Sequence, residues 1–169
     1  VKANTKFMIQ SRMGGGRVMY VAEHMGGGQY RMKIRQAKYD NREFFYYNSA
    51  SGVLESALNR GYGIAVQKGK NNRGALLVLR PKDKSNTQVW SYKRNSYHNW
   101  SPFSNKGLCM DVAGASNKDG ATVHVWSCHN GVNQRFEAQY NTKKAAAGKS
   151  TGVKANTKFM IQSRMGGGR

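Results

Sequence analysis

The sequence predicts an all-β fold made of three consecutive repeats, and two observations support this prediction. Short apolar runs alternate with polar residues at the two-residue period of a strand, and Gly-, Asn- and Lys-rich stretches separate these runs. Equivalent apolar positions also recur 45 and then 46 residues apart. Four short strands in each of three repeats give about twelve strands, and a closed β architecture is how such a chain buries its apolar face.

Three segments of each repeat align without a gap. They are 16–21, 30–35 and 42–47 in the first repeat, 61–66, 75–80 and 87–92 in the second, and 107–112, 121–126 and 133–138 in the third. The best apolar columns are Val21, Val66 and Val112; Met32, Leu77 and Val123; Ile34, Leu79 and Val125; and Phe45, Trp90 and Phe136. A preceding strand fits the same register, with Ile9, Leu54 and Trp100 as counterparts. We expect the three large aromatic residues of the last column to converge at the centre.

Each repeat closes on a similar tripeptide: "QVW" at 88–90, "QRF" at 134–136 and, more loosely, "EFF" at 43–45. This pattern resembles the ricin-type β-trefoil lectin family, whose repeats end in a Q-x-W motif. The resemblance covers about residues 7–139 and is strongest in the third repeat. It implies a β-trefoil domain at residues 1–139, with repeats at about 7–47, 52–92 and 98–139.

The only two cysteines, Cys109 and Cys128, lie in the third repeat. In the family, a cysteine two residues before a key aspartate pairs with one seventeen residues after it, and Cys109, Asp111 and Cys128 reproduce this spacing. The resemblance therefore implies a disulfide, an oxidising compartment and a secreted protein. Two buried free thiols in a cytosolic protein are the alternative. Zinc is a poorer one, since no Cys-x-x-Cys spacing or neighbouring His pair accompanies them.

The third repeat also carries the residue types that a hexose needs. A carboxylate accepts hydrogen bonds from neighbouring hydroxyls, an aromatic plane covers the C–H face, and an amide both donates and accepts. By resemblance these roles fall to Asp111, Trp126 and Asn133. His124 stands where the family often places a polar side chain beside the sugar, and Gln134 is expected to hold the aspartate and its loop. The family's usual ligand is galactose or N-acetylgalactosamine.

The first two repeats lack this set. Tyr20 and Ala65 stand where the third repeat has its aspartate, and Arg35 and Arg80 stand where it has Trp126. Without a carboxylate or a stacking plane, neither repeat is expected to bind a neutral sugar, although such an arginine could hold a sulfate or carboxylate. We expect one sugar site in the trefoil.

No enzyme, cofactor or metal site is expected. The four histidines, at positions 24, 98, 124 and 129, match no nucleophile–base arrangement, and the eight acidic residues offer no persuasive glycosidase pair. The longest apolar run, "ALLVL", is too short to span a membrane. The chain opens without a charged and apolar leader, so a targeting signal would have been removed or would lie upstream.

The net charge of +20 would attract nucleic acid, sulfated glycan or another anionic partner. Binding of this kind through counterion release is expected to weaken steeply with salt. A neutral sugar held by a carboxylate and a tryptophan is expected to respond little to salt.

The sequence of residues 1–17 recurs identically at 153–169. The segment 140–158, which overlaps the start of this copy, is rich in Ala, Gly and Lys and is interpreted as a linker. The copy is interpreted as the start of the next unit of a tandem array, and an artificial duplication is the alternative. The unit is then an extracellular carbohydrate-binding module of a repetitive or fibre-forming protein. Alternatives are a filament subunit that assembles by strand donation and keeps a vestigial sugar site, a basic module for nucleic acid or sulfated glycan, and the targeting part of a toxin.

Overall fold

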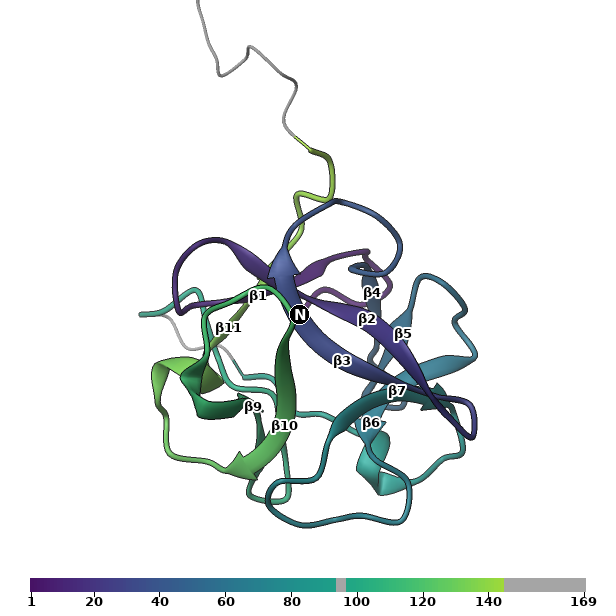
Figure 1. Cartoon of the computed structure of the whole chain (residues 1–169). Helices are drawn as coiled ribbons and strands as arrows, with labels where there is room; N and C mark the ends of the chain where they lie inside the picture. Colours follow the sequence, from purple (N-terminus) through teal and green to yellow (C-terminus); the bar gives the residue numbers. More distant parts are fainter. Residues whose placement is uncertain (94–96, 145–169) are drawn as a thin grey trace, which may run out of the picture.

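The computed structural model describes residues 1–93 and 97–144, and these form one antiparallel β structure (Figure 1). The strands are β1 (Met8–Ser11), β2 (Arg17–Gly26), β3 (Gln29–Gln36), β4 (Phe45–Asn48), β5 (Val53–Ser56), β6 (Tyr62–Val66), β7 (Leu77–Pro81), β8 (Ser104–Asn105), β9 (Leu108–Val112), β10 (Ala121–Ser127) and β11 (Phe136–Gln139). Three 3-10 turns, η1 (Asn86–Gln88), η2 (Ala113–Ala115) and η3 (Val132–Gln134), complete the described elements.

The strand pairing repeats three times along the chain, as the sequence predicts. Each repeat contributes one hairpin, formed by β2 with β3, β6 with β7, and β9 with β10. Strand β3 also pairs with β7 and β10, so the three hairpins meet (Figure 1). Between repeats, β4 pairs with β5, and β11 pairs with β1 to return the end of the trefoil to its beginning. This is the predicted β-trefoil.

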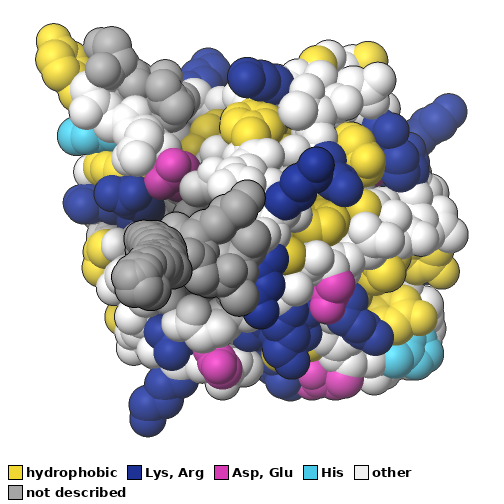
Figure 2. Space-filling model, turned by 90° about the horizontal axis from the view of Figure 1, so that it is seen from above, with side chains coloured by type: hydrophobic (Ala, Val, Ile, Leu, Met, Phe, Trp, Pro, Cys, Tyr) yellow, Lys and Arg dark blue, Asp and Glu magenta, His cyan; other side chains and the backbone are white. Residues whose placement is uncertain are grey.

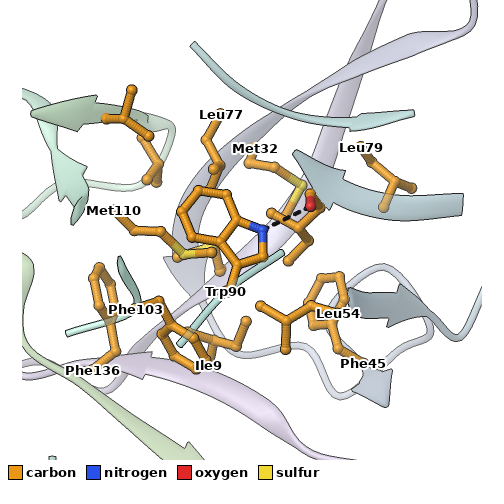
Figure 3. Packing of buried hydrophobic residues seen from close by; sticks show 14 of the residues in the cluster. Ile9, Met32, Phe45, Leu54, Leu77, Leu79, Trp90, Phe103, Met110 and Phe136 are labelled. Carbon is orange, nitrogen blue, oxygen red and sulfur yellow. Dashed lines mark hydrogen bonds between the residues drawn. The ribbon is translucent and has the colours of Figure 1, made fainter. Parts of the chain in front are cut away.

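The repeated apolar columns build a single central cluster. Every member of the four columns is buried, with at most 3% of its surface exposed. Trp90 lies at the centre of Figure 3 among side chains from all three repeats, including Phe45 and Phe136, and its indole N–H donates to the carbonyl of Ile64 at 2.8 Å. The expected convergence of the three aromatic residues is therefore confirmed. Because large apolar side chains supply most of the burial, this cluster is the main source of stability.

The predicted place of Trp100 in the first strand of the third repeat is wrong, and Phe103 takes that place. Phe103 is fully buried and lies with its ring 6.4 Å from that of Phe136. Trp100 is only partly buried and stacks on His98. The connection into the third repeat is three residues longer than a constant spacing assumes, and only packing reveals where the repeat resumes.

The predicted strand at 87–92 is also absent from the described structure. Its first residues form η1, and only Ser91 makes a ladder contact, with Ser104. The opposing segment contains Pro102, which has no N–H to donate to a ladder. The structure therefore describes eleven strands rather than twelve.

The first and last strands of the trefoil lie side by side. Met8 faces Gln139 at one end of the β1–β11 ladder, and Ser11 faces Phe136 at the other. The backbone N–H of Lys2 also donates to the hydroxyl of Tyr140 at 2.6 Å. The copy of this segment at 153–169, and the linker from residue 145 onward, lie outside the described residues. No helix among the described residues has the length and apolar character needed to cross a bilayer.

Candidate functional site

The register of β9 and β10 brings the predicted sugar residues to one outer face. Val123 and Val125 point into the core, so His124 and Trp126 point the other way. His124 lies directly across the ladder from Asp111, as the pairing of the two strands fixes. Trp126 is 38% exposed, as its position in the alternation predicts.

Asp111 is buried at the centre of this face, with 3% of its surface exposed. One carboxylate oxygen lies 2.8 Å from Nε2 of His124, and the other accepts a hydrogen bond from Nε2 of Gln134 at 2.8 Å. Nε2 of His129 lies 3.5 Å from the same second oxygen. The aspartate is thus held in one orientation by side chains from β10 and from the loop that follows it.

Gln134 performs the supporting role expected of it. It is fully buried, its amide oxygen accepts from the backbone N–H of His129 at 3.0 Å, and its amide nitrogen donates to the carbonyl of Ser127 at 3.0 Å. The same amide nitrogen also reaches Asp111. One side chain therefore fixes both the loop after β10 and the carboxylate.

The glutamine of the second repeat makes the equivalent loop contacts without a carboxylate to hold. Gln88 accepts from the backbone N–H of Asp83 at 2.9 Å and donates to the carbonyl of Pro81 at 3.0 Å. These partners lie five and seven residues before the glutamine, as they do for Gln134. The loop clamp is a feature of the repeats, and the hold on Asp111 is specific to the third.

Asn133 and the turn η2 complete a surface hollow around the carboxylate. The side-chain amide of Asn133 donates to the carbonyl of Val112 at 3.1 Å, which orients it beside the end of β9. The hollow has a volume of about 310 Å³, and Gly114, which has no side chain, and Ala115, which has only a methyl group, form part of its wall. Its other lining residues are Asp111, His124, Trp126, His129 and Asn133. This volume and these polar and aromatic groups suit a single sugar ring.

A disulfide joins Cys109 to Cys128 across the site. Cys109 faces Trp126 in the β9–β10 ladder, and Cys128 immediately precedes His129. The covalent bond therefore fixes the strand that carries Asp111 to the start of the loop that closes the hollow.

Asp111 differs from the other carboxylates in its partners. All eight acidic residues lie in the described parts of the chain, and seven of them form an ion pair with Lys or Arg. The seven are Glu23, Asp40, Glu43, Glu55, Asp83, Asp119 and Glu137. For Glu55, burial raises the pKa, but hydrogen bonds from Lys82 and other neighbours outweigh it and hold the pKa below its ordinary value. Asp111 has only histidines as basic partners, so no lysine or arginine among the described residues neutralises it.

The corresponding places in the first two repeats are filled by internal ion pairs. The guanidinium of Arg35 lies 4.3 Å from the ring centroid of Tyr20, and its Nε donates to Glu43 at 2.8 Å. Arg80 is buried and bonds Asp83. Neither arginine presents a free cation to a sulfate, and neither place has a carboxylate open to a sugar.

Three features of the site have no motif in the sequence that predicts them. His129 belongs to no catalytic or metal-binding pattern, although its place directly after Cys128 puts it in the clamped loop. The small residues of η2 carry no motif. Arg73 lies over Trp126 from another repeat, and no local pattern reports such a contact. Among residues 1–93 and 97–144, no group of three or more His, Cys, Asp or Glu side chains could hold a metal ion.

Comparison with known proteins decides the family. The sequence pattern of the ricin-type beta-trefoil lectin domain matches residues 50–160, which is more than half of the chain. This chain belongs to the ricin-type β-trefoil lectin family. Most of the match lies on the second and third repeats, where the Q-x-W-like motifs are best preserved. No curated protein sequence matches the lectin chain significantly.

Solved structures confirm the β-trefoil fold of this lectin-family chain. The designed three-fold symmetric protein ThreeFoil superposes with a TM-score of 0.69 at 17% identity, and the match covers 79% of this chain and 97% of that one. The C-half of the earthworm R-type lectin, solved with GalNAc, gives a TM-score of 0.61 at 18% identity over 80% and 98% of the two chains. A mosquitocidal holotoxin gives 0.68 at 19% identity over 82% of this chain, but this chain spans only 16% of that protein.

Proposed function

We propose that the third repeat binds a galactose-type sugar, galactose or N-acetylgalactosamine, and that it is the one sugar site of the described trefoil. The observation that carries the proposal is the carboxylate of Asp111, which pairs with no lysine or arginine of the described residues and lines a hollow beside the exposed ring of Trp126. In the other two repeats the equivalent places hold no such pair. The GalNAc complex of the earthworm lectin, a protein of the same fold, supports this choice of ligand.

Each side chain has a definite part in this proposal. Asp111 accepts hydrogen bonds from two neighbouring hydroxyls, and charge-assisted bonds of this kind are the strongest that a neutral sugar can make. Trp126 covers the C–H face of the ring, which is continuous in galactose because the 4-hydroxyl is axial and points away from it. Asn133 and His124 supply further polar contacts, while Gln134 positions Asp111 without reaching the ligand.

The proposed setting is extracellular. The disulfide between Cys109 and Cys128 supports it, because such bonds persist in oxidising compartments and are rare in the cytosol. A secreted lectin meets glycans on cell surfaces and in the matrix. The proposed role is binding and not catalysis.

Replacing Trp126 with alanine tests the stacking role. We expect the affinity for methyl galactoside, measured by isothermal titration calorimetry, to fall about tenfold or more, because the C–H face of the sugar loses the large indole ring that lines the hollow. The matched control is Trp100→Ala, which removes a partly exposed tryptophan outside the hollow. Methyl glucoside, which differs only at the 4-hydroxyl, is the control ligand and is expected to bind more weakly. Equal losses for the two variants would contradict the proposed site.

We also propose that the trefoil works as a unit of a repetitive assembly. Strand β1 makes the ladder with β11, and the sequence of β1 and its flanks recurs in full at residues 153–169. A second copy of the same sequence can form the same ladder in a neighbouring trefoil, so identical strands can exchange between units. Repeated single sites raise avidity without any new contact to the sugar.

Removal of residues 153–169 tests this role in assembly. We expect the full chain to form oligomers that persist at moderate salt, because a strand ladder depends little on ionic strength. The shortened chain, which keeps its own β1, is expected to be monomeric and fully folded. Sedimentation and circular dichroism at two salt concentrations measure both properties. Identical sizes for the two chains would exclude strand exchange through this segment.

A further inference from the structure

A loop of the second repeat reaches Trp126, one of the residues that line the sugar hollow. Residues 67–76 connect β6 to β7, and the end of this connection, residues 74–76, lies beside β10 of the third repeat. The backbone N–H of Gly74 donates to the carbonyl of Val125 at 2.8 Å, and the N–H of Val125 donates to the carbonyl of Ala75 at 2.9 Å. Two backbone bonds thus fix the end of this loop beside Trp126.

Gly74 provides the backbone conformation that brings the loop beside the tryptophan. Its φ angle is +88°, a conformation that residues other than glycine rarely adopt. A Cβ at this position would lie in ordinary van der Waals contact, 3.7 Å from Cζ3 of Trp126. The positive φ, and not a lack of space, therefore favours glycine here, and the turn places the preceding residue beside the indole ring.

That residue is Arg73, and its guanidinium carbon lies 5.2 Å from the centroid of the Trp126 ring. This is within the range of a cation–π contact. Arg73 is exposed, and it forms no ion pair with any of the eight carboxylates, all of which lie in the described residues. It differs in this from Arg35 and Arg80, whose charges are neutralised within their own repeats.

The loop carries two further cations and no acid. Lys68 and Lys70 precede Arg73 and are exposed as well. On the face shown in Figure 2, Lys and Arg side chains are more numerous than Asp and Glu, in line with the net charge of +20 of the whole chain. Arg73 is distinguished from this general charge by its fixed place at the aromatic wall of the hollow.

We infer that the third-repeat site prefers a galactose-type sugar that bears an acidic group, a sulfate or a carboxylate, and that Arg73 determines this preference. The inference rests on the proposed sugar site. With the ring on Trp126 and its hydroxyls on Asp111, an anionic substituent at the side of Arg73 meets a guanidinium that can donate two parallel hydrogen bonds. Arg73 keeps its contact with the indole while it donates, since a guanidinium donates in its own plane.

The carboxylate of Asp111, which no lysine or arginine of the described residues neutralises, would repel an acidic group placed close to it. The inference therefore requires the hydroxyls of the ligand to face Asp111 and the acidic substituent to lie on the Arg73 side of Trp126. The site thus separates a polar, hydroxyl-binding end from a cationic end.

Binding of neutral and acidic galactosides to the wild type, Arg73→Gln and Lys70→Gln tests this inference. The ligands are methyl galactoside, galactose 6-sulfate and galacturonic acid, measured by calorimetry at one fixed ionic strength. We expect the wild type to bind at least one acidic sugar about tenfold more tightly than the neutral one, the increment of one charge-assisted pair. Arg73→Gln is expected to bring this ratio close to one. Lys70→Gln, which removes the same charge from the same loop, is expected to preserve it.

The two acidic ligands distinguish a sulfate preference from a carboxylate preference. Equal affinities of the wild type for all three sugars would overturn the inference and leave the neutral sugar site standing. The inference would also be overturned if Arg73→Gln bound methyl galactoside more tightly than the wild type and the wild type showed no preference for acidic sugars. That result would show that Arg73 only covers the Trp126 ring. An equal loss of the ratio in both variants would assign the effect to general charge. If no galactoside of any kind binds to the wild type, the proposed sugar site itself fails.

Discussion

Asp111→Asn is expected to abolish galactoside binding while the trefoil remains folded. The substitution removes the charge that two sugar hydroxyls need and turns one acceptor into a donor. The new amide N–H of the asparagine then lies opposite groups that are themselves donors, such as Nε2 of Gln134. Loss of two charge-assisted hydrogen bonds corresponds to about 3 kcal/mol or more, a factor of at least about 100 in affinity. For a shallow single site, the heat of binding then falls to the level of buffer.

The control for this variant is Asp119→Asn. Asp119 is an exposed aspartate paired with Arg17 and does not line the hollow, so its loss is not expected to alter sugar affinity. Calorimetry with methyl galactoside measures both variants, and circular dichroism and thermal melting check that each is folded. A folded Asp111→Asn protein that binds as tightly as the wild type would refute the third-repeat site.

Removing the disulfide with the double variant Cys109→Ala and Cys128→Ala is expected to cost about 3 kcal/mol of unfolding free energy, the chain-entropy value for a loop of this size. The two cysteines are separated by 19 residues, and the loop between them contains both strands of the site hairpin. Without the bond, the unfolded chain gains freedom, and the segment that carries His129 loses its link to β9. Sugar affinity is therefore also expected to fall, although less than in Asp111→Asn.

Urea unfolding, followed by tryptophan fluorescence, measures this effect. The wild type with and without a reducing agent provides an independent comparison, since reduction breaks the same bond without changing any residue. Agreement between the reduced wild type and the double variant is expected. An unfolding free energy that is equal in all three samples would show that the bond does not stabilise the trefoil.

The repeats could be predicted from the sequence because burial imposes the same spacing on each of them. Val21, Val66 and Val112 occupy one column, and each is at most 1% exposed. A column of this kind needs only strand alternation and a constant offset. The prediction failed for Trp100, because a longer connection shifts the register and an aromatic residue three positions away, Phe103, fills the core instead.

Some residues of the candidate site could likewise be predicted from the sequence, and others could not. Asp111 and Trp126 could be predicted because their place in the alternation of two paired strands puts both on the outer face. Arg73 could not, since it reaches Trp126 from a loop of a different repeat. Contacts between loops of different repeats depend on how the hairpins meet, which strand periodicity does not encode.

The pairing of β1 with β11 has a mechanical consequence. The chain enters the trefoil near Lys2 and leaves it near Tyr140, and these residues are hydrogen-bonded to each other. Tension applied between these two points pulls the adjacent ends of two antiparallel strands apart, beginning at the pair of Met8 and Gln139. The force therefore breaks the hydrogen bonds of the ladder one after another (unzipping). It does not load all of them at once, as a force along the strands (shear) would. Stretched units of this kind would yield at low force and close again when the load is released, so a chain of them would extend before it breaks.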